Sequence, residues 1–332
     1  MKEDPSVLII QTAFLGDVVL ATALVESIHA QLPKAAIDFV VRKGNEGLLQ
    51  GNPGLRHVYI FDKAEKYKNL MTLVSEFRKA KYDWVINVQR FATTGLMTAL
   101  SGGQITIGFD KNPLSFLFSK RVSHAIGDVH EVTRNLSLLA PLGIQTSARP
   151  RLYPSSAQFD KVKQYQTATY VTVSPASVWF TKQWPAEQWI DFIGKLRGMS
   201  IHLLGAPGDV ELCDQIRTAL PTLPLTNLAG RLSLLESAAL MAGAKMNFVN
   251  DSAPLHLASA MNAPVTAVFC STVPDFGFGP LSDQSYVVQT NEQLDCRPCG
   301  LHGYHACPQG HFKCATSIRA DQLMAGIRSD GQ

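Results

Sequence analysis

Residues 248–270 read FVNDSAPLHLASAMNAPVTAVFC, and this stretch decides the fold class. An apolar run ends at Asn250, the segment Asp251–Pro254 opens a helix, and a second apolar run follows over Pro264–Phe269. Polar side chains before a helix and a proline in its first turn are typical helix-start signals. A strand, a helix and a second strand in this order form a βαβ unit, which predicts a parallel sheet.

The same alternation extends through most of the chain. Further strands are expected at Ser6–Gln11, Ala36–Val41, His57–Phe61, Trp84–Val88, Ile105–Gly108, Tyr170–Ser174, Ser200–Leu204 and Met246–Asn250. Helices are expected at about Asp17–Leu32, Tyr67–Ala80, Pro185–Leu196, Val210–Leu220, Leu234–Ala244, Ala253–Met261 and Ile318–Ile327. This rhythm predicts α/β domains with parallel sheets and helices on both faces.

The alternation is interrupted between about Gln145 and Tyr165, where two prolines and a polar stretch favour a linker. We therefore expect two domains, 1–155 and 156–332, and the last helix is a candidate to pack back on the first of them. A chain of 332 residues is long enough for two separate cores. Ligands of such sheets bind beyond the carboxyl ends of the strands, so the expected site is a cleft between the domains.

Composition and charge narrow the functional classes. A net charge of +3 gives no case for nucleic-acid binding. The excess of basic residues lies in the first 150 residues, which suits an anionic partner or is ordinary scatter of surface charge. Neither a secretory signal nor an apolar run of roughly 20 residues is visible, so a cytoplasmic protein is expected.

Two segments carry candidate site residues. In the turn before the first long helix, Gly16 permits a tight backbone and Asp17 can either cap the helix or face the cleft; spacing alone favours the cap. In the second half, Lys182 follows a strand, and Ser252 opens a helix whose backbone amides form a ready anion site. His256 lies in the first turn of that helix, where a buried structural histidine is the alternative to a ligand contact.

Four motifs, in this order, resemble glycosyltransferase family 9, the lipopolysaccharide heptosyltransferases. They are QTAFLGDVVLA at 11–21, HEVTRNLSLLAPLG at 130–143, Lys-x-Trp-Pro at 182–185 and Asp-Ser-x-Pro-x-His at 251–256. The resemblance implies a glycosyltransferase-B type fold, an α/β architecture of two Rossmann-like domains facing a central cleft. The first domain would bind the acceptor and the second the nucleotide sugar.

The resemblance also implies an activity. This is inverting, metal-independent transfer of a heptose from ADP-heptose to a saccharide of the lipopolysaccharide core, with no cofactor required. The alternatives are a transferase for another nucleotide sugar or another saccharide acceptor, and a non-catalytic nucleotide-sugar-binding protein of envelope assembly. The absence of an Asp-x-Asp motif agrees with metal-independent transfer, because divalent cations prefer such oxygen ligands beside phosphates.

Residue roles follow from the same resemblance. Asp17 would be the catalytic base, and Lys182 would offset charge on the leaving diphosphate beside Ser174. The donor motif comprises Asp251, Ser252, Ala253 and His256, and it departs from the family at Ala253, where glycine is common. A second departure is Pro207, in the place of an acidic residue that contacts the ribose, so Asp209 either substitutes for it or simply starts the following helix.

Acceptor-side candidates lie in the first domain. They are Gly16, Arg42 after a strand end, and His130 and Arg134, which are four residues apart on one helical face. The last two either face anionic groups of the acceptor or pin their helix to the sheet. The segment Leu114–Arg121 mixes apolar and basic residues; peripheral contact with the inner face of the cytoplasmic membrane is one interpretation, and packing is the other.

Four cysteines cluster as Cys296-x2-Cys299-x7-Cys307-x6-Cys314, with three histidines nearby. In a cytoplasmic protein, such a cluster favours metal over disulfides. A structural zinc ion bound by the four thiolates is one hypothesis, and reduced structural thiols are the other.

Overall fold

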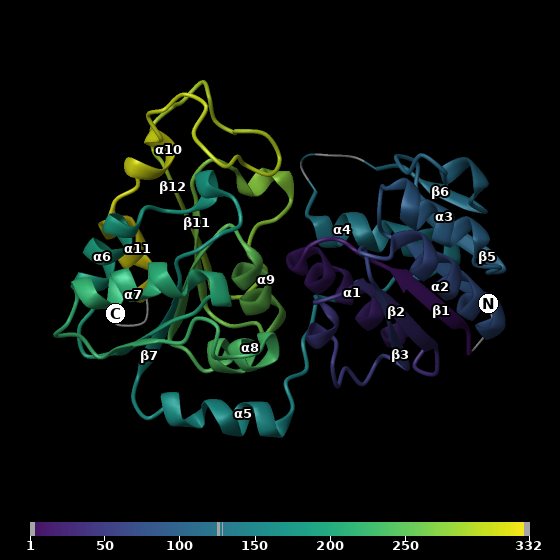
Figure 1. The fold of residues 1–332 in the computed structure, drawn as a ribbon, viewed down its shortest axis with the longest axis horizontal. Coiled ribbons are helices and arrows are strands. Elements are labelled where there is room, and N and C mark those ends of the chain that lie inside the picture. Colours follow the sequence, from purple (N-terminus) through teal and green to yellow (C-terminus); the bar gives the residue numbers. More distant parts are fainter. Residues whose placement is uncertain (1–3, 125–126, 128, 329–332) are drawn as a thin grey trace. The chain divides into compact units, whose positions relative to one another are not determined.

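Each half of the chain forms its own six-stranded parallel sheet in the computed structural model, which describes residues 4–124, 127 and 129–328 (Figure 1). The contacts divide the chain into two units, Met1–Tyr153 and Pro154–Gln332. The expected α/β class with two parallel sheets is confirmed.

In the first unit the strand order is β3-β2-β1-β4-β5-β6. The strands are β1 (Ser6–Ile10), β2 (Ala36–Arg42), β3 (His57–Phe61), β4 (Trp84–Asn87), β5 (Ile105–Phe109) and β6 (Lys120–Val122). The helices are α1 (Leu15–Gln31), α2 (Lys66–Ala80), α3 (Ala92–Leu100) and α4 (Glu131–Leu136). Strand β1 is central and almost wholly buried, which explains its unbroken apolar sequence.

In the second unit the order is β12-β11-β10-β7-β8-β9. The strands are β7 (Tyr170–Ser174), β8 (Ser200–Leu203), β9 (Leu225–Asn227), β10 (Met246–Asn250), β11 (Val265–Phe269) and β12 (Ser285–Gln289). The helices are α5 (Ser156–Val162), α6 (Ala186–Lys195), α7 (Val210–Ala219), α8 (Leu234–Ala242), α9 (Ala253–Ala260), α10 (Lys313–Thr316) and α11 (Ala320–Arg328). Buried aromatic side chains fill its core, with the rings of Trp184 and Trp189 at 4.9 Å.

Both sheets have the same order when strands are counted along each unit, 3-2-1-4-5-6. In such a sheet the order reverses between the first and fourth strands, and the loops after these two strands form the ligand-binding crevice. The reversal lies between β1 and β4 in the first unit and between β7 and β10 in the second. The fold thus points to four loops as the places for functional side chains.

One expectation about the organisation, the linker between about Gln145 and Tyr165, needs correction. The segment expected as a linker contains helix α5, because Ser155 and Gln158 form a capping box that starts it. Helix α5 packs on α8, so the connection between the units ends just before it. The last helix, α11, packs on α6, β11 and β12 with Leu323 fully buried, so it completes the core of the second unit.

None of the helices in the described ranges is both long enough and apolar enough to cross a bilayer.

Candidate active site

The loop after β1 carries Asp17 in the first turn of α1. The helix begins at Leu15, and its N-cap position belongs to Phe14, which makes no side-chain cap. The expectation from spacing that Asp17 caps this helix is therefore wrong. Its carboxylate is half-buried and lies at the carboxyl edge of the first sheet, beside the point where the strand order reverses.

The loops after β1 and β4 are joined by buried amide side chains. Gln11 Oε1 accepts hydrogen bonds from the Ala13 amide at 3.2 Å and from Gln89 Nε2. The backbone amide of Gln89 in turn donates to Asn87 Oδ1 at 2.8 Å. Because these groups are buried, the network fixes the backbone that presents Asp17.

Helix α4, which packs on α1, brings a second carboxyl group toward Asp17. The side chain of Glu131 is 12% exposed and forms an ion pair with Arg134. Burial raises the pKa of Glu131 to about 7; the charge of Asp17 adds to this shift, whereas Arg134 and Arg90 oppose it. Sequence reasoning missed Glu131, although its position beside His130 and three residues before an arginine was a signal of a buried pair.

The candidate acceptor residues fall into two groups. His130 caps α4 through Nδ1, which accepts from the Val132 amide at 3.1 Å. Arg134 is buried, and its Nη2 donates to the Val129 carbonyl at 3.1 Å, so this bond and the ion pair with Glu131 hold α4 in place. Arg42, at the end of β2, instead lies over the exposed ring of Phe14, with its guanidinium carbon 5.3 Å from the ring centre. Gly16, in the first turn of α1, lies two residues after Phe14.

In the second unit, the loops after β7 and β10 meet in a buried ion pair. Lys182 Nζ lies 2.7 Å from Asp251 Oδ2, and the two side chains are 15% and 6% exposed. Asp251 Oδ2 also accepts a hydrogen bond from the Thr272 hydroxyl at 2.6 Å. The structure therefore brings together two residues that the sequence had placed in separate motifs.

Asn250 holds the same two loops together through its side-chain amide. Its Oδ1 accepts from the Trp184 amide at 3.1 Å, and its Nδ2 donates to the Pro175 carbonyl at 2.7 Å. The hydroxyl of Ser174, at the end of β7, is buried and has no hydrogen-bond partner among the described residues. The hydrogen-bonding capacity of this hydroxyl is thus unused among the described residues.

The start of α9 provides the remaining donor-side candidates. Ser252 occupies the N-cap position without a side-chain cap, and its hydroxyl donates to the Asn250 carbonyl at 3.4 Å. Ala253 is the first helical residue, so the glycine common in the family is not needed for a left-handed backbone. His256 is buried, with its ring edge-on to Phe278 at 6.3 Å.

Asp209 closes a local turn. Its Oδ2 accepts from the Ala206 amide at 2.7 Å, across the 3-10 turn Pro207–Asp209 that leads into α7. The carboxylate is thus already engaged with its own loop.

The segment Arg297–Tyr304 is bonded to the loops after β7 and β11 and to the end of β12, and is called the clamp below. The guanidinium of Arg297 donates to the carbonyl oxygens of Phe269, Cys270 and Thr272 and to the side chain of Gln289. The Tyr304 amide donates to the Thr181 hydroxyl at 2.7 Å, directly before Lys182. Sequence reasoning missed this clamp, because the Arg297 contacts depend on how the chain returns to the ends of β11 and β12, and the Tyr304 contact joins residues 123 positions apart.

The four clustered cysteines are not arranged as the hypothesised zinc site in this geometry. Within residues 4–124, 127 and 129–328, no three His, Cys, Asp or Glu side chains are grouped so as to hold a metal ion. The Cys299 thiol donates to the Cys296 carbonyl at 3.1 Å, and Cys296 Sγ lies 3.8 Å from His311 Nε2. Burial raises the pKa of Cys314 to about 12, and the neighbouring cysteines add to that shift, which favours protonated thiols. Cys307, also a free thiol, is one of these neighbours.

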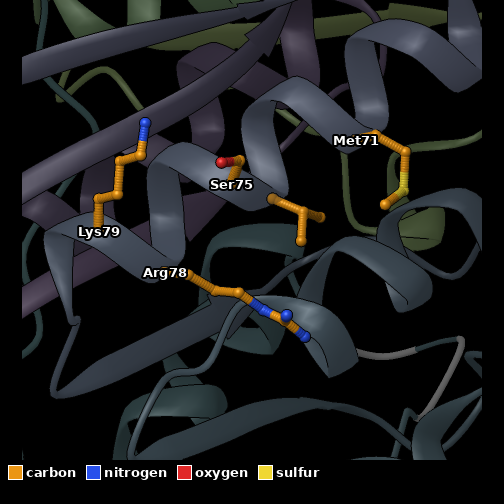
Figure 2. Close-up of a pocket in the computed structure, with 5 residues that line it drawn as sticks. Met71, Ser75, Arg78 and Lys79 are labelled. Carbon is orange, nitrogen blue, oxygen red and sulfur yellow. The ribbon is translucent and has the colours of Figure 1, made fainter.

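A shallow hollow on the outer side of α2 contains none of these candidates. Figure 2 shows Met71, Ser75, Arg78 and Lys79 along that helix. The Arg78 guanidinium is held by the Leu100 carbonyl, which its Nε reaches at 2.8 Å. We assign this hollow no part in the candidate site.

Two Rossmann-like sheets, each with its candidate residues at the reversal of strand order, define the glycosyltransferase-B class. Glycosyltransferase family 9 (heptosyltransferase) is the family whose model matches the chain, over residues 70–303. The chain therefore belongs to glycosyltransferase family 9 and is a glycosyltransferase.

Individual relatives agree with this assignment. Lipopolysaccharide heptosyltransferase 3 of Escherichia coli is 28% identical, covering 78% of this chain and 82% of the relative. The family 9 glycosyltransferase of Veillonella parvula has a TM-score of 0.83 at 20% identity and covers 99% of this chain and 98% of its own. The E. coli heptosyltransferase WaaC with ADP-2-deoxy-2-fluoro heptose has a TM-score of 0.74 at 21% identity, covering 98% of this chain and all of the other. At these identities, the two structures establish the shared fold.

Proposed function

We propose that this protein transfers a heptose from ADP-heptose to a saccharide of the lipopolysaccharide core, with inversion at the anomeric carbon. The observation that carries the proposal is the buried Lys182–Asp251 pair at the strand-order reversal of the second sheet. Asp17 occupies the corresponding edge of the first sheet. The names of its relatives support the substrates, since they include a lipopolysaccharide heptosyltransferase and a heptosyltransferase with a fluorinated ADP-heptose.

The proposed reaction is a single displacement. Asp17 accepts the proton of the acceptor hydroxyl as that oxygen forms its bond to the anomeric carbon. The bond from this carbon to the diphosphate breaks on the opposite face, and its electron pair leaves with ADP. Lys182 and the amides at the start of α9 stabilise the negative charge that grows on the diphosphate, and the Ser174 hydroxyl is placed to add a hydrogen bond. No step requires a metal ion.

The departure from the family motif around Asp209 concerns the contact with the nucleoside ribose. One carboxylate oxygen of Asp209 accepts from the Ala206 amide, and Pro207 stands where the family carries the acidic residue that contacts the ribose. This departure bears on the nucleoside, and a transferase of the same mechanism for another nucleotide sugar is the second candidate. A non-catalytic nucleotide-sugar-binding protein is the further alternative, and it predicts donor binding without turnover.

The deciding experiment is turnover of ADP-heptose by the purified protein with a lipid A–core acceptor and EDTA. Release of ADP that depends on acceptor and resists EDTA supports the proposal. Turnover of a different nucleotide sugar alone would keep the mechanism and replace the donor. Donor binding with no turnover on any core acceptor would leave the non-catalytic alternative.

Replacing Ala253 with glycine tests the departure from the family motif. Because Ala253 is already helical, we expect ADP affinity and turnover to stay within about twofold of wild type, with stability lowered by no more than about 1 kcal/mol. Calorimetric titration with ADP and steady-state kinetics measure both. A rise in ADP affinity of an order of magnitude would show instead that the alanine methyl group obstructs the phosphates.

Replacing Glu131 with glutamine tests the buried carboxyl beside Asp17. Its folded pKa of about 7 lies above the ordinary value of 4.5, so the folded state holds the extra proton between these pH values. The contribution of Glu131 to the free energy of unfolding therefore falls as pH rises from 4.5 to 7. Above pH 7 the loss of free energy reaches its full value, roughly 3 kcal/mol, because the folded state then buries a charged carboxylate.

We expect the free energy of unfolding of wild type, relative to Glu131→Gln, to fall by this amount across that window. Urea denaturation at a series of pH values measures it. Glu76→Gln, at an exposed position on α2, is the matched control and should follow wild type. Parallel curves for wild type and Glu131→Gln would rule out a raised pKa at this position.

A further inference from the structure

The carboxylate of Asp251 is held by two donors at the same oxygen. Lys182 Nζ lies 2.7 Å from Asp251 Oδ2, and the Thr272 hydroxyl donates to that oxygen at 2.6 Å. Thr272 is 1% exposed and follows β11, so its hydroxyl reaches the ion pair from a third loop of the second sheet. The terminal torsion of an aspartate is soft, and a second donor on the carboxylate restricts its rotation.

The neighbouring residue of the same loop reaches the backbone before Lys182. The Ser271 hydroxyl donates to the Thr181 hydroxyl oxygen at 3.1 Å, and Ser271 and Thr181 are both buried. Residues 271 and 272 thus fix the chain on one side of Lys182 and the carboxylate that faces its ammonium group.

The backbone of Gly303 lies against the aliphatic stem of Lys182. Gly303 has a φ of +77°, and a Cβ atom at this position would lie 3.0 Å from Lys182 Cγ and 2.9 Å from the Thr181 hydroxyl oxygen. A side chain here would be strained by its backbone and would displace the lysine. Lys182 is therefore held at its stem as well as at its ammonium group, while 15% of its side chain stays exposed to a ligand.

Arg297 fixes the loop that carries Thr272. Its Nη2 donates to the Thr272 carbonyl at 2.8 Å, and its Nε donates to the Cys270 carbonyl at 2.7 Å. The Cys299 amide donates to the Ser271 carbonyl at 2.8 Å. Each carbonyl from residue 270 to residue 272 is thus bonded to the clamp, so the clamp sets the direction of the Thr272 hydroxyl.

We propose that Thr272 is a positioning residue of the transfer reaction: supported by Arg297, it holds the Asp251 carboxylate and thereby directs the Lys182 ammonium group at the leaving diphosphate. The inference rests on the proposed function, in which Lys182 offsets the charge that grows on that diphosphate. A misdirected ammonium group loses stabilisation that is needed most in the transition state. The loss therefore falls on kcat more than on nucleotide affinity.

Thr272→Val removes the hydroxyl and keeps the shape of the side chain. We expect kcat to fall by about 10-fold to 100-fold, as for a lost hydrogen bond to a charged group, and ADP affinity to fall by about threefold at most. Thr272→Ser keeps the hydroxyl and should turn over within about threefold of wild type. Steady-state kinetics with ADP-heptose and calorimetric titration with ADP measure the two quantities.

Thr172→Val is the matched control. Thr172 lies on β7 of the same unit and is fully buried, and its hydroxyl donates to Asn247 Oδ1 at 2.6 Å. The control loses a buried hydrogen bond of the same length, so its thermal stability should fall about as far as that of Thr272→Val, while its kcat stays at the wild-type value. An equal fall of kcat in both variants would assign the loss to general destabilisation and would overturn the inference.

Arg297→Lys tests the support behind Thr272, because lysine keeps the charge and lacks the planar fork that binds several carbonyls at once. We expect kcat to fall in this variant. The double variant Arg297→Lys/Thr272→Val should have the kcat of Thr272→Val, since both residues act through the same carboxylate. Losses that multiply in the double variant would contradict this order of action.

Acetylation of Lys182 by acetic anhydride, followed by peptide mass spectrometry, tests the positioning without any substrate. Lys182 should react about threefold to tenfold faster in Thr272→Val, because losing a net hydrogen bond shifts a local opening equilibrium by about that factor. Thr272→Ser and Thr172→Val should react as wild type does. Lys195, which is 39% exposed, is the internal reference and should react equally in all variants. An unchanged rate at Lys182 in Thr272→Val overturns the inference.

The two kinds of measurement separate this inference from the proposed function. If wild type does not turn over ADP-heptose, the proposed function fails, and the acetylation rates still decide whether Thr272 positions Lys182. If wild type turns over ADP-heptose and Thr272→Val does so equally fast, the proposed function stands and the inference fails.

Discussion

Asp17→Asn is expected to lower kcat by about 100-fold to 10,000-fold, the range typical of a lost general base. Asparagine keeps the size of the side chain and cannot accept the proton of the acceptor hydroxyl. The nucleotide is proposed to bind the second unit, so ADP affinity should stay within about twofold while kcat falls. Steady-state kinetics with ADP-heptose and calorimetric titration with ADP measure the two quantities separately.

Glu76→Gln, at an exposed position on α2 of the same unit, is the control and should retain full turnover. Wild-type turnover in Asp17→Asn would refute the base assignment. Loss of ADP binding together with turnover would indicate a folding defect, which a thermal unfolding measurement would reveal.

Lys182→Met is expected to impair both stability and turnover. It leaves Asp251 buried without its cation, which costs about 3–5 kcal/mol of folding free energy for a broken buried pair. It also removes the charge that is proposed to offset the leaving diphosphate, so kcat should fall by about 100-fold to 1,000-fold. Urea denaturation and single-turnover kinetics measure the two effects.

The double variant Lys182→Met/Asp251→Asn separates these roles. Removing both charges should recover most of the lost stability, because no unpaired ion remains buried. It should recover none of the lost turnover. Recovery of turnover would mean that Lys182 acts only by neutralising Asp251, which would contradict its proposed part in the reaction.

Lys195→Met is the matched control for this series. Lys195 pairs with Asp191 and Asp321 on the surface, where its side chain is 39% exposed. Exposed pairs contribute about 1 kcal/mol or less, so both stability and turnover should be nearly unchanged.

Local signals in the sequence predicted the central strands and the helices that follow them. The apolar runs of the buried strands β1, β4, β7 and β10, and the helix-start signals after them, placed Asp17, Lys182 and Asp251 on loops at strand ends. Edge strands β6 and β9 are three residues long, too short to give a periodic signal, and were missed. Helix α5 was missed because prolines before it suggested a linker.

Contacts between residues far apart in the sequence could not be predicted from these local signals. The bond between Lys182 and Asp251 joins residues 69 positions apart, and it depends on the parallel pairing of β7 with β10. Glu131 acquires its raised pKa only because α4 packs on α1 and buries the carboxyl near Asp17. The assignment of Asp17 as a cap failed because helix α1 starts two residues earlier than spacing suggested.

The clamp formed by Arg297–Tyr304 also sets the order in which the protein matures during synthesis. The first unit ends at Tyr153, so all of its strands leave the ribosome before the second sheet begins. The second unit waits for residues 297–323, because Ala320 and Leu323 of α11 complete its core and Arg297 fastens the ends of β11 and β12. The Lys182 loop is therefore fastened from this side only after residue 304 has been synthesised, and a chain released before residue 297 would carry a finished first unit and donor loops without their clamp.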